Sequence, residues 1–262
     1  MRATTITLFL ACHLAVAHNG QAIEFPEDYT RLLIPVTAIA VTGAYGSVWT
    51  TEWAMYNGSG ENLYVIGPFP YLYLSPPVQD NTVDLGATKR LILNEAAPGF
   101  DGAFVYVPTA DVETLPMSLR VRDTSVNSQS YGTSIPIIRP AGFKPTVHLI
   151  DVPTDPAYRT MLRIYGIGPE PQVVRLEIYT PDGRSPIEQR DVVLHVHERV
   201  GLEEVPRPTY AQLDPLSDSV RNAGQKVRLA ISVSESDAAT RPVWAFVSIS
   251  HNQTQQVTTV VP

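Results

Sequence analysis

The sequence predicts an all-β protein made of two tandem immunoglobulin-like β-sandwich domains that follow an N-terminal signal peptide. Apolar residues recur at every second position, turn-forming clusters separate these runs, and one strand pattern returns 109 positions later. Proline occupies 23 of 262 positions, about 9% against a usual share of about 5%. Because proline breaks helices but is tolerated in turns and edge strands, this excess disfavours a helical protein.

Residues 1–22 have the pattern of a cleaved secretory signal peptide. Arg2 supplies a positive start, residues 6–17 form an apolar run, and Ala15-Val16-Ala17 is a small-residue cleavage signature. The run is too short to span a membrane, and no later stretch reaches that length. We therefore expect a secreted, periplasmic or cell-surface protein without a transmembrane segment. Cys12, the single cysteine, permits an alternative in which it is lipidated and anchors a lipoprotein.

Residues 30–140 are expected to form the first sandwich. Between residues 48 and 56, Trp49, Thr51, Trp53 and Met55 share one face of an alternating run, so both tryptophans are expected to face a core. Clusters rich in Gly, Pro, Asn and Asp at residues 57–60 and 98–102 predict turns. Helical turns are expected only in short segments such as residues 89–94 and 210–217.

Residues 141–262 are expected to form the second sandwich. At an offset of 109, the positions expected on the inner face match: Trp49, Thr51, Trp53 and Met55 correspond to Tyr158, Thr160, Leu162 and Ile164. Each copy then enters a glycine-rich turn and another alternating strand. Two copies of about 110 residues are each long enough to enclose a core of their own. The Arg139-Pro140-Ala141-Gly142 segment has a composition suited to a short linker between them.

Three features together resemble the uncharacterised β-sandwich repeat modules found, often in tandem, in bacterial secreted proteins. These are the Ile34-Pro35-Val36 opening, a Tyr/Trp-x-Thr strand followed by an Asn/Gly turn, and a closing strand that ends in Asn-x-Thr. The similarity covers residues 34–64, 103–138, 158–184 and 243–262. It implies a surface or secreted non-catalytic module and carries no active-site residues.

His195 and His197 are the strongest candidates for metal-binding residues. Two histidines separated by one residue project from the same face of a strand, as zinc or iron ligands do in several β-sheet enzymes. Val192, Leu194 and Val196 are expected to face the core, so the two histidines should lie on the solvent side. A catalytic metal needs a further ligand, and no spacing in the sequence supplies one. An exposed polar face is the alternative interpretation.

Tyr71 and Tyr73 are candidate binding residues, because both alternating faces of Tyr71-Leu72-Tyr73-Leu74 are apolar. Either this strand is buried on both sides, or the two tyrosines form a contact patch. Exposed aromatic rings of the first domain would also suit stacking on sugars. Separately, Asn57-Gly58-Ser59 and Asn252-Gln253-Thr254 match the N-glycosylation pattern, which often arises by chance in turns.

The net charge and the motif content of the chain disfavour several classes of function. The formal net charge is −7, which disfavours nucleic acid and anionic lipid as partners. The sequence has no nucleophile elbow, phosphate-binding loop or calcium loop, so we expect no cofactor and no enzymatic activity. The sequence predicts a structural, adhesive or protein-binding role, with an unidentified protein or cell-surface partner. A carbohydrate-binding module using first-domain aromatics and a metal-dependent enzyme using His195 and His197 are the alternatives.

Overall fold

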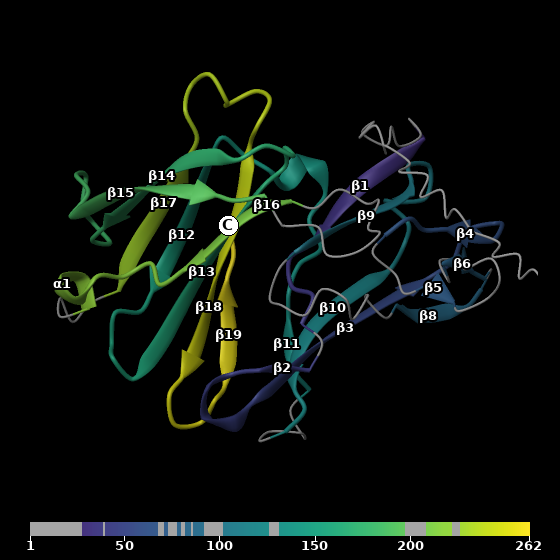
Figure 1. The fold of residues 1–262 in the computed structure, drawn as a ribbon, viewed down its shortest axis with the longest axis horizontal. Helices are drawn as coiled ribbons and strands as arrows, with labels where there is room; N and C mark the ends of the chain where they lie inside the picture. The colour runs from purple at the N-terminus through teal and green to yellow at the C-terminus, as the bar shows by residue number, and fades with distance from the viewer. Residues whose placement is uncertain are drawn as a thin grey trace, which may run out of the picture.

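The computed structural model describes residues 28–38, 40–67, 71–72, 78–79, 82–84, 86–91, 102–125, 131–196, 208–221 and 226–262. The predicted signal peptide, residues 1–22, lies outside these ranges. The described chain is dominated by antiparallel β-sheet (Figure 1), which confirms the all-β prediction. Within the described ranges, the α-helical structure is limited to α1 (Asp218–Arg221). No helix of the described chain is long and apolar enough to cross a membrane.

The prediction of a helical turn at residues 210–217 is wrong for residues 210–213, which belong to a strand. Strand β16 (Thr209–Leu213) occupies these positions, because Thr209 and Ala211 are buried while Tyr210 and Gln212 alternate with them toward the other face. This is the period of a strand. Residues 89–91 likewise belong to strand β8 (Thr88–Leu91) and not to a helical turn.

The first half, residues 28–138, has β3 at the centre of its largest sheet. The strands of this sheet are β2 (Val41–Thr42), β3 (Val48–Tyr56), β8, β10 (Met117–Asp123) and β11 (Thr133–Ser134). The other pairs are β1 (Tyr29–Ile34) with β9 (Ala103–Pro108), β4 (Leu63–Tyr64) with β7 (Thr82–Val83), and β5 (Tyr71–Leu72) with β6 (Val78–Gln79). A bridge between Ile66 and Tyr106 links the segment after β4 to β9. Side chains from β1, β3, β9 and β10 share one hydrophobic cluster.

In the described part of the second half, residues 143–262, two four-stranded sheets enclose a separate hydrophobic cluster. One sheet has the order β12 (Thr146–Val152), β17 (Val227–Ser232), β14 (Gln172–Tyr179) and β15 (Glu188–Leu194). The other has the order β16, β13 (Tyr158–Gly166), β18 (Val243–His251) and β19 (Val257–Val260).

The strand pairings of the two halves agree with the internal repeat found in the sequence. Strand β3 pairs with β10, which pairs with β11, just as β13 pairs with β18, which pairs with β19. Even the register corresponds, because Trp49 lies opposite Asp123 and Tyr158 lies opposite His251 at the matching ends of the two central strands. The two halves therefore bring equivalent ends of β3 and β13 into comparable sheet positions.

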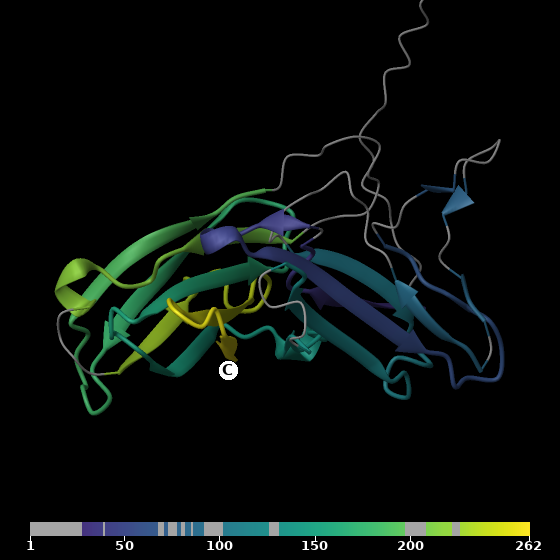
Figure 2. The same cartoon turned by 90° about the horizontal axis from the view of Figure 1, so that it is seen from below.

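The hydrophobic cluster of the first half includes three aromatic residues from the second. Tyr165, Trp244 and Phe246 lie on β13 and β18 and are buried in that cluster. The Tyr165 ring stacks on Trp244 and Phe246, with centroids 6.0 and 6.4 Å apart, and the Tyr165 hydroxyl donates a hydrogen bond to the Pro35 carbonyl. The two halves thus share a buried apolar contact, and Figure 2 shows them following one another along an arc.

The segment expected to be a linker forms a short 3₁₀ turn, η2 (Pro140–Gly142). Next to it, the Arg139 guanidinium donates to the Val112 carbonyl over 3.0 Å and pairs with Glu113 at 3.2 Å. Residues on both sides of η2 are also tied into β-structure: Ile138 bridges Leu33, and Lys144 bridges Val243. The connection between the halves is therefore held at both ends by backbone hydrogen bonds.

Candidate binding groove

Two adjoining cavities lie where the halves meet. The first has a volume of about 500 Å³ and the second about 270 Å³. They share lining residues from β3, β10, β11 and β19: Trp49, Val121, Thr133 and Val257. We call the two cavities together the junction groove. Their volumes lie near the range of roughly 300–1,000 Å³ typical of small-molecule sites.

Trp49 lies in the wall of both cavities. It is partly exposed, whereas Trp53, on the same face of β3, is only 1% exposed. The prediction that both tryptophans face the core is confirmed for Trp53. Trp49 also packs against the hydrophobic cluster of the first half but is only partly buried, because its end of β3 extends to the junction of the halves. Its indole packs closely on Gly43, where an added Cβ would lie 2.4 Å from the indole Nε1. Glycine at position 43 thus leaves room for the ring beside the groove.

The exposure of Trp49 gives a direct optical test. The chain has three tryptophans, and Trp53 and Trp244 are buried. Replacing Trp49 by phenylalanine is expected to remove most of the fluorescence that acrylamide quenches, because the quencher reaches an indole only where solvent does. Stern–Volmer plots of the folded protein measure this. Trp244→Phe is the control, which should leave the quenchable fraction in place; an unchanged slope for Trp49→Phe would contradict the position of the indole.

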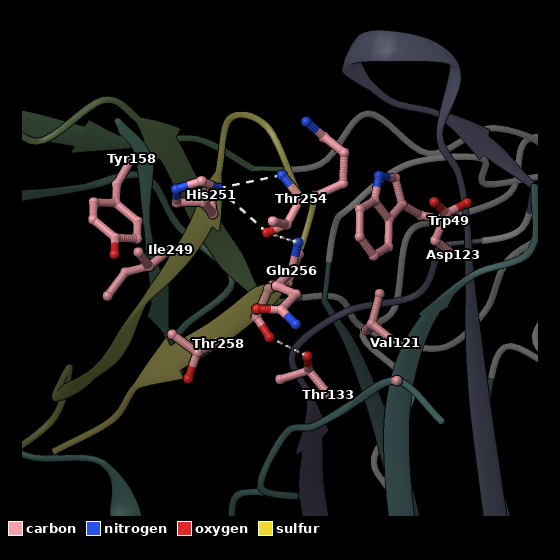
Figure 3. A pocket seen from close by; sticks show the side chains of 13 residues that line it. Trp49, Val121, Asp123, Thr133, Tyr158, Ile249, His251, Thr254, Gln256 and Thr258 are labelled. Carbon is pink, nitrogen blue, oxygen red and sulfur yellow. Dashed lines mark hydrogen bonds between the residues drawn. The ribbon is translucent and has the colours of Figure 1, made fainter. Parts of the chain in front are cut away.

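A hairpin of the second half forms the wall opposite Trp49. Figure 3 shows Thr254 and Gln256 facing Trp49 across the first cavity, with His251 and Tyr158 behind them. His251 Nδ1 accepts the backbone N–H groups of Gln253 and Thr254 over 3.3 and 3.2 Å. Because Nδ1 acts as an acceptor, the neutral ring carries its hydrogen on Nε2. The hairpin thus presents neutral donors and acceptors whose positions are fixed by its own hydrogen bonds.

Among the described residues that line the first cavity, the carboxylate is that of Asp123, and it already accepts hydrogen bonds from the protein. Its Oδ1 accepts hydrogen bonds from the Val48 N–H at 3.1 Å, the Ser125 N–H at 2.9 Å and the Ser125 hydroxyl at 2.9 Å. Asp123 is 2% exposed. These bonds hold the end of β10 against the start of β3, so Asp123 fixes the wall that carries Trp49.

The second cavity has a cationic wall formed by Arg159 and Arg163 of β13. Arg163 is only 6% exposed; it donates to Gln212 Oε1 at 2.9 Å and to the Ser248 hydroxyl at 3.1 Å. Arg159 donates to Gln255 Oε1 at 2.9 Å. Both arginines project from the face of β13 opposite to Leu162 and Ile164, which fill the core of the second half.

The first half closes over this cationic wall with the 3₁₀ turn η1 (Ala44–Gly46). Tyr45 in this turn is 68% exposed and has a left-handed backbone conformation, with φ of 57°, which is uncommon and strained for a residue with a side chain. Its ring lies 4.9 Å from the Arg159 guanidinium carbon, within the range of a cation–π contact. The turn therefore links the two halves across the groove.

The structure separates the predicted histidine site from this groove. His195 is exposed at the end of β15, and its backbone N–H and C=O exchange hydrogen bonds of 2.9 and 3.0 Å with Tyr210 of β16, so the position joins the two sheets of the second half. Val196, expected in the core, is exposed because the chain leaves the sheet after Leu194. His197 lies outside the described residues. Among those that are described, no group of three His, Cys, Asp or Glu side chains is placed to hold a metal ion.

The other predicted sites have different outcomes. Tyr71 belongs to β5, but its side chain and all of Tyr73 lie outside what the structure describes. Asn57, in the first glycosylation pattern, is 0% exposed. Its Nδ2 group donates to the Glu61 and Val83 carbonyls, both at 2.8 Å, so this amide is a structural group inside the fold and is inaccessible to a glycosylating enzyme.

The comparisons with known proteins assign no relationship: no model of a protein family, no curated protein and no solved structure matches the chain.

Proposed function

We propose that this protein is a secreted, non-catalytic binding protein with an adhesive role at or outside the cell surface. In this proposal a cleaved signal peptide precedes two tandem immunoglobulin-like sandwich domains, and the partner binds in the junction groove. The observation that carries the proposal is the groove itself, a pair of cavities between two halves that are joined through buried aromatic residues. A preformed concave site with a few fixed polar groups is the usual form of a binding site.

The residues in the groove suit binding more than reaction chemistry. Trp49 offers a partly exposed indole, a side chain that is enriched where proteins contact partners. The polar groups around it, including His251 and Asp123, are held by hydrogen bonds to neighbouring backbone groups. Such a wall is ordered before a partner arrives, which lowers the entropy cost of binding.

Site-specific photo-cross-linking tests this proposal. Gln256 lines the first cavity, is exposed and faces Trp49 (Figure 3), so a photoreactive p-benzoylphenylalanine at this position should form an adduct with a bound partner. The matched control is the same replacement at Val173, which is 53% exposed on β14, away from the groove lining. In cells that produce the protein naturally, irradiation is expected to give a higher-mass species from position 256 and none from position 173. Absence of the adduct, or equal adducts at both positions, would overturn the proposal.

A further inference from the structure

The second cavity of the junction groove has a positively charged lining, although the chain as a whole carries a net negative charge. The net charge is −7, yet the charged side chains among the described residues that line this cavity are two arginines, Arg159 and Arg163. Hydroxyl groups of Ser248, Ser250 and Thr259 complete the wall around them. Guanidinium and hydroxyl donors without a lining carboxylate form a site for an anionic group.

The Arg159 guanidinium is held in place where Arg159 lines the second cavity. Its Nη2 donates to Gln255 Oε1, and its guanidinium carbon lies over the Tyr45 ring. A guanidinium that is fixed from two sides before a ligand arrives can pair with a ligand carboxylate at a low entropy cost.

The rest of the groove is suited to a sugar ring. The Trp49 indole lines both cavities, and the apolar C–H face of a pyranose can pack on such a ring. Thr254, Gln256 and Thr258 present short polar side chains toward the first cavity. These groups can pair with sugar hydroxyls as both donors and acceptors. The two cavities therefore place an aromatic surface and neutral polar groups beside the cationic wall.

A peptide strand fits this groove less well than a saccharide. A peptide added to a sheet edge needs unpaired backbone groups along that edge. Here the two nearest edge strands, β11 and β19, approach each other, and the Thr133 hydroxyl donates to the Val257 carbonyl at 2.7 Å. This contact closes the space that an inserted strand would need.

We infer that the junction groove binds a carboxylate-bearing saccharide, with the uronate carboxylate at Arg159 and a sugar ring against Trp49. This inference rests on the proposed function, because it names the chemistry of the partner held in the same groove. An acidic polysaccharide outside the cell would supply such units repeatedly. Binding through a charge-assisted contact should weaken as salt concentration rises.

Isothermal titration calorimetry with uronate oligosaccharides of galacturonate, glucuronate and mannuronate tests the inference. At least one of these is expected to bind, and its methyl ester, which has the same ring without the charge, should bind about tenfold more weakly. Arg159→Gln should lose about the same factor for the acid and little for the ester. Arg175→Gln is the matched control, since Arg175 is exposed and pairs with Asp191 outside the groove; it should bind like the unaltered protein.

Trp49→Ala should weaken the acid and the ester alike, because the sugar ring loses its packing surface in both. Equal binding of acid and ester, or unchanged binding by Arg159→Gln, would overturn the carboxylate assignment. If no uronate binds, the saccharide inference fails; a cross-link from position 256 to a protein would then leave the proposed function standing with a different partner. Binding of a peptide with a free carboxyl terminus in place of every uronate would also overturn the inference.

Discussion

Replacing Tyr165 by alanine is expected to lower the free energy of unfolding by about 3–5 kcal/mol, the usual cost of removing a large buried aromatic side chain. Tyr165 is fully buried and stacks on Trp244 and Phe246. Gly102 packs so closely on this ring that a Cβ there would lie 2.7 Å from it. Since these contacts join the halves, we also expect unfolding to lose cooperativity between them.

Guanidinium chloride titrations followed by circular dichroism and by tryptophan fluorescence would measure both effects. Tyr165→Phe is the matched control: it keeps the ring and removes only the hydroxyl that donates to the Pro35 carbonyl, so a loss of about 1 kcal/mol is expected. In Tyr165→Ala the two probes should give separate transitions. A single coincident transition with a loss below that of the phenylalanine variant would show that the aromatic contact does not couple the halves.

Replacing Asn57 by alanine is expected to cost about 2–4 kcal/mol, because several buried polar groups lose their partners together. The Asn57 Nδ2 group donates to two carbonyls, and its Oδ1 accepts the Ser59 N–H at 3.0 Å and the Ser59 hydroxyl at 2.7 Å. One of those carbonyls belongs to Val83, on β7 of the separate β4–β7 pair. The side chain therefore holds the turn after β3 against a strand of another sheet.

Asn252 provides the comparison for Asn57, since it lies in the second glycosylation pattern of the chain. It is partly exposed, and its Nδ2 donates to the Pro156 carbonyl at 2.8 Å. Asn252→Ala should therefore cost about 1 kcal/mol or less. Urea titrations of both variants would measure the difference, and equal losses would contradict the structural role assigned to Asn57.

The alternation in the sequence was enough to predict the all-β class and the central strands, because a half-buried strand imposes its period on the chain locally. It was not enough to place Trp49. Trp49 and Trp53 share one face of β3, and what separates them is the position of η1 and of the second half, which no local pattern contains. The same holds for Asn57, whose burial depends on Val83, which is 26 residues further along the chain.

The sequence pattern also does not predict the cationic wall formed by Arg159 and Arg163. Arg159 and Arg163 alternate with Thr160, Leu162 and Ile164 in the ordinary pattern of a strand with one polar face. A polar face next to a core is normally solvated, so nothing marks these arginines as special. They become a candidate site only because the first half covers that face, a consequence of contacts between segments more than 100 residues apart in the chain.

The aromatic contact between the halves also affects the order in which the chain can mature during synthesis. The first half is made first, yet the hydrophobic cluster it contains is completed by Trp244 and Phe246, which leave the ribosome near the end of translation. Until β18 has been made, Leu33, Phe104 and their neighbours lack part of their covering. The N-terminal half therefore reaches its final packing only after β18 has been made, although the N-terminal half is synthesised first.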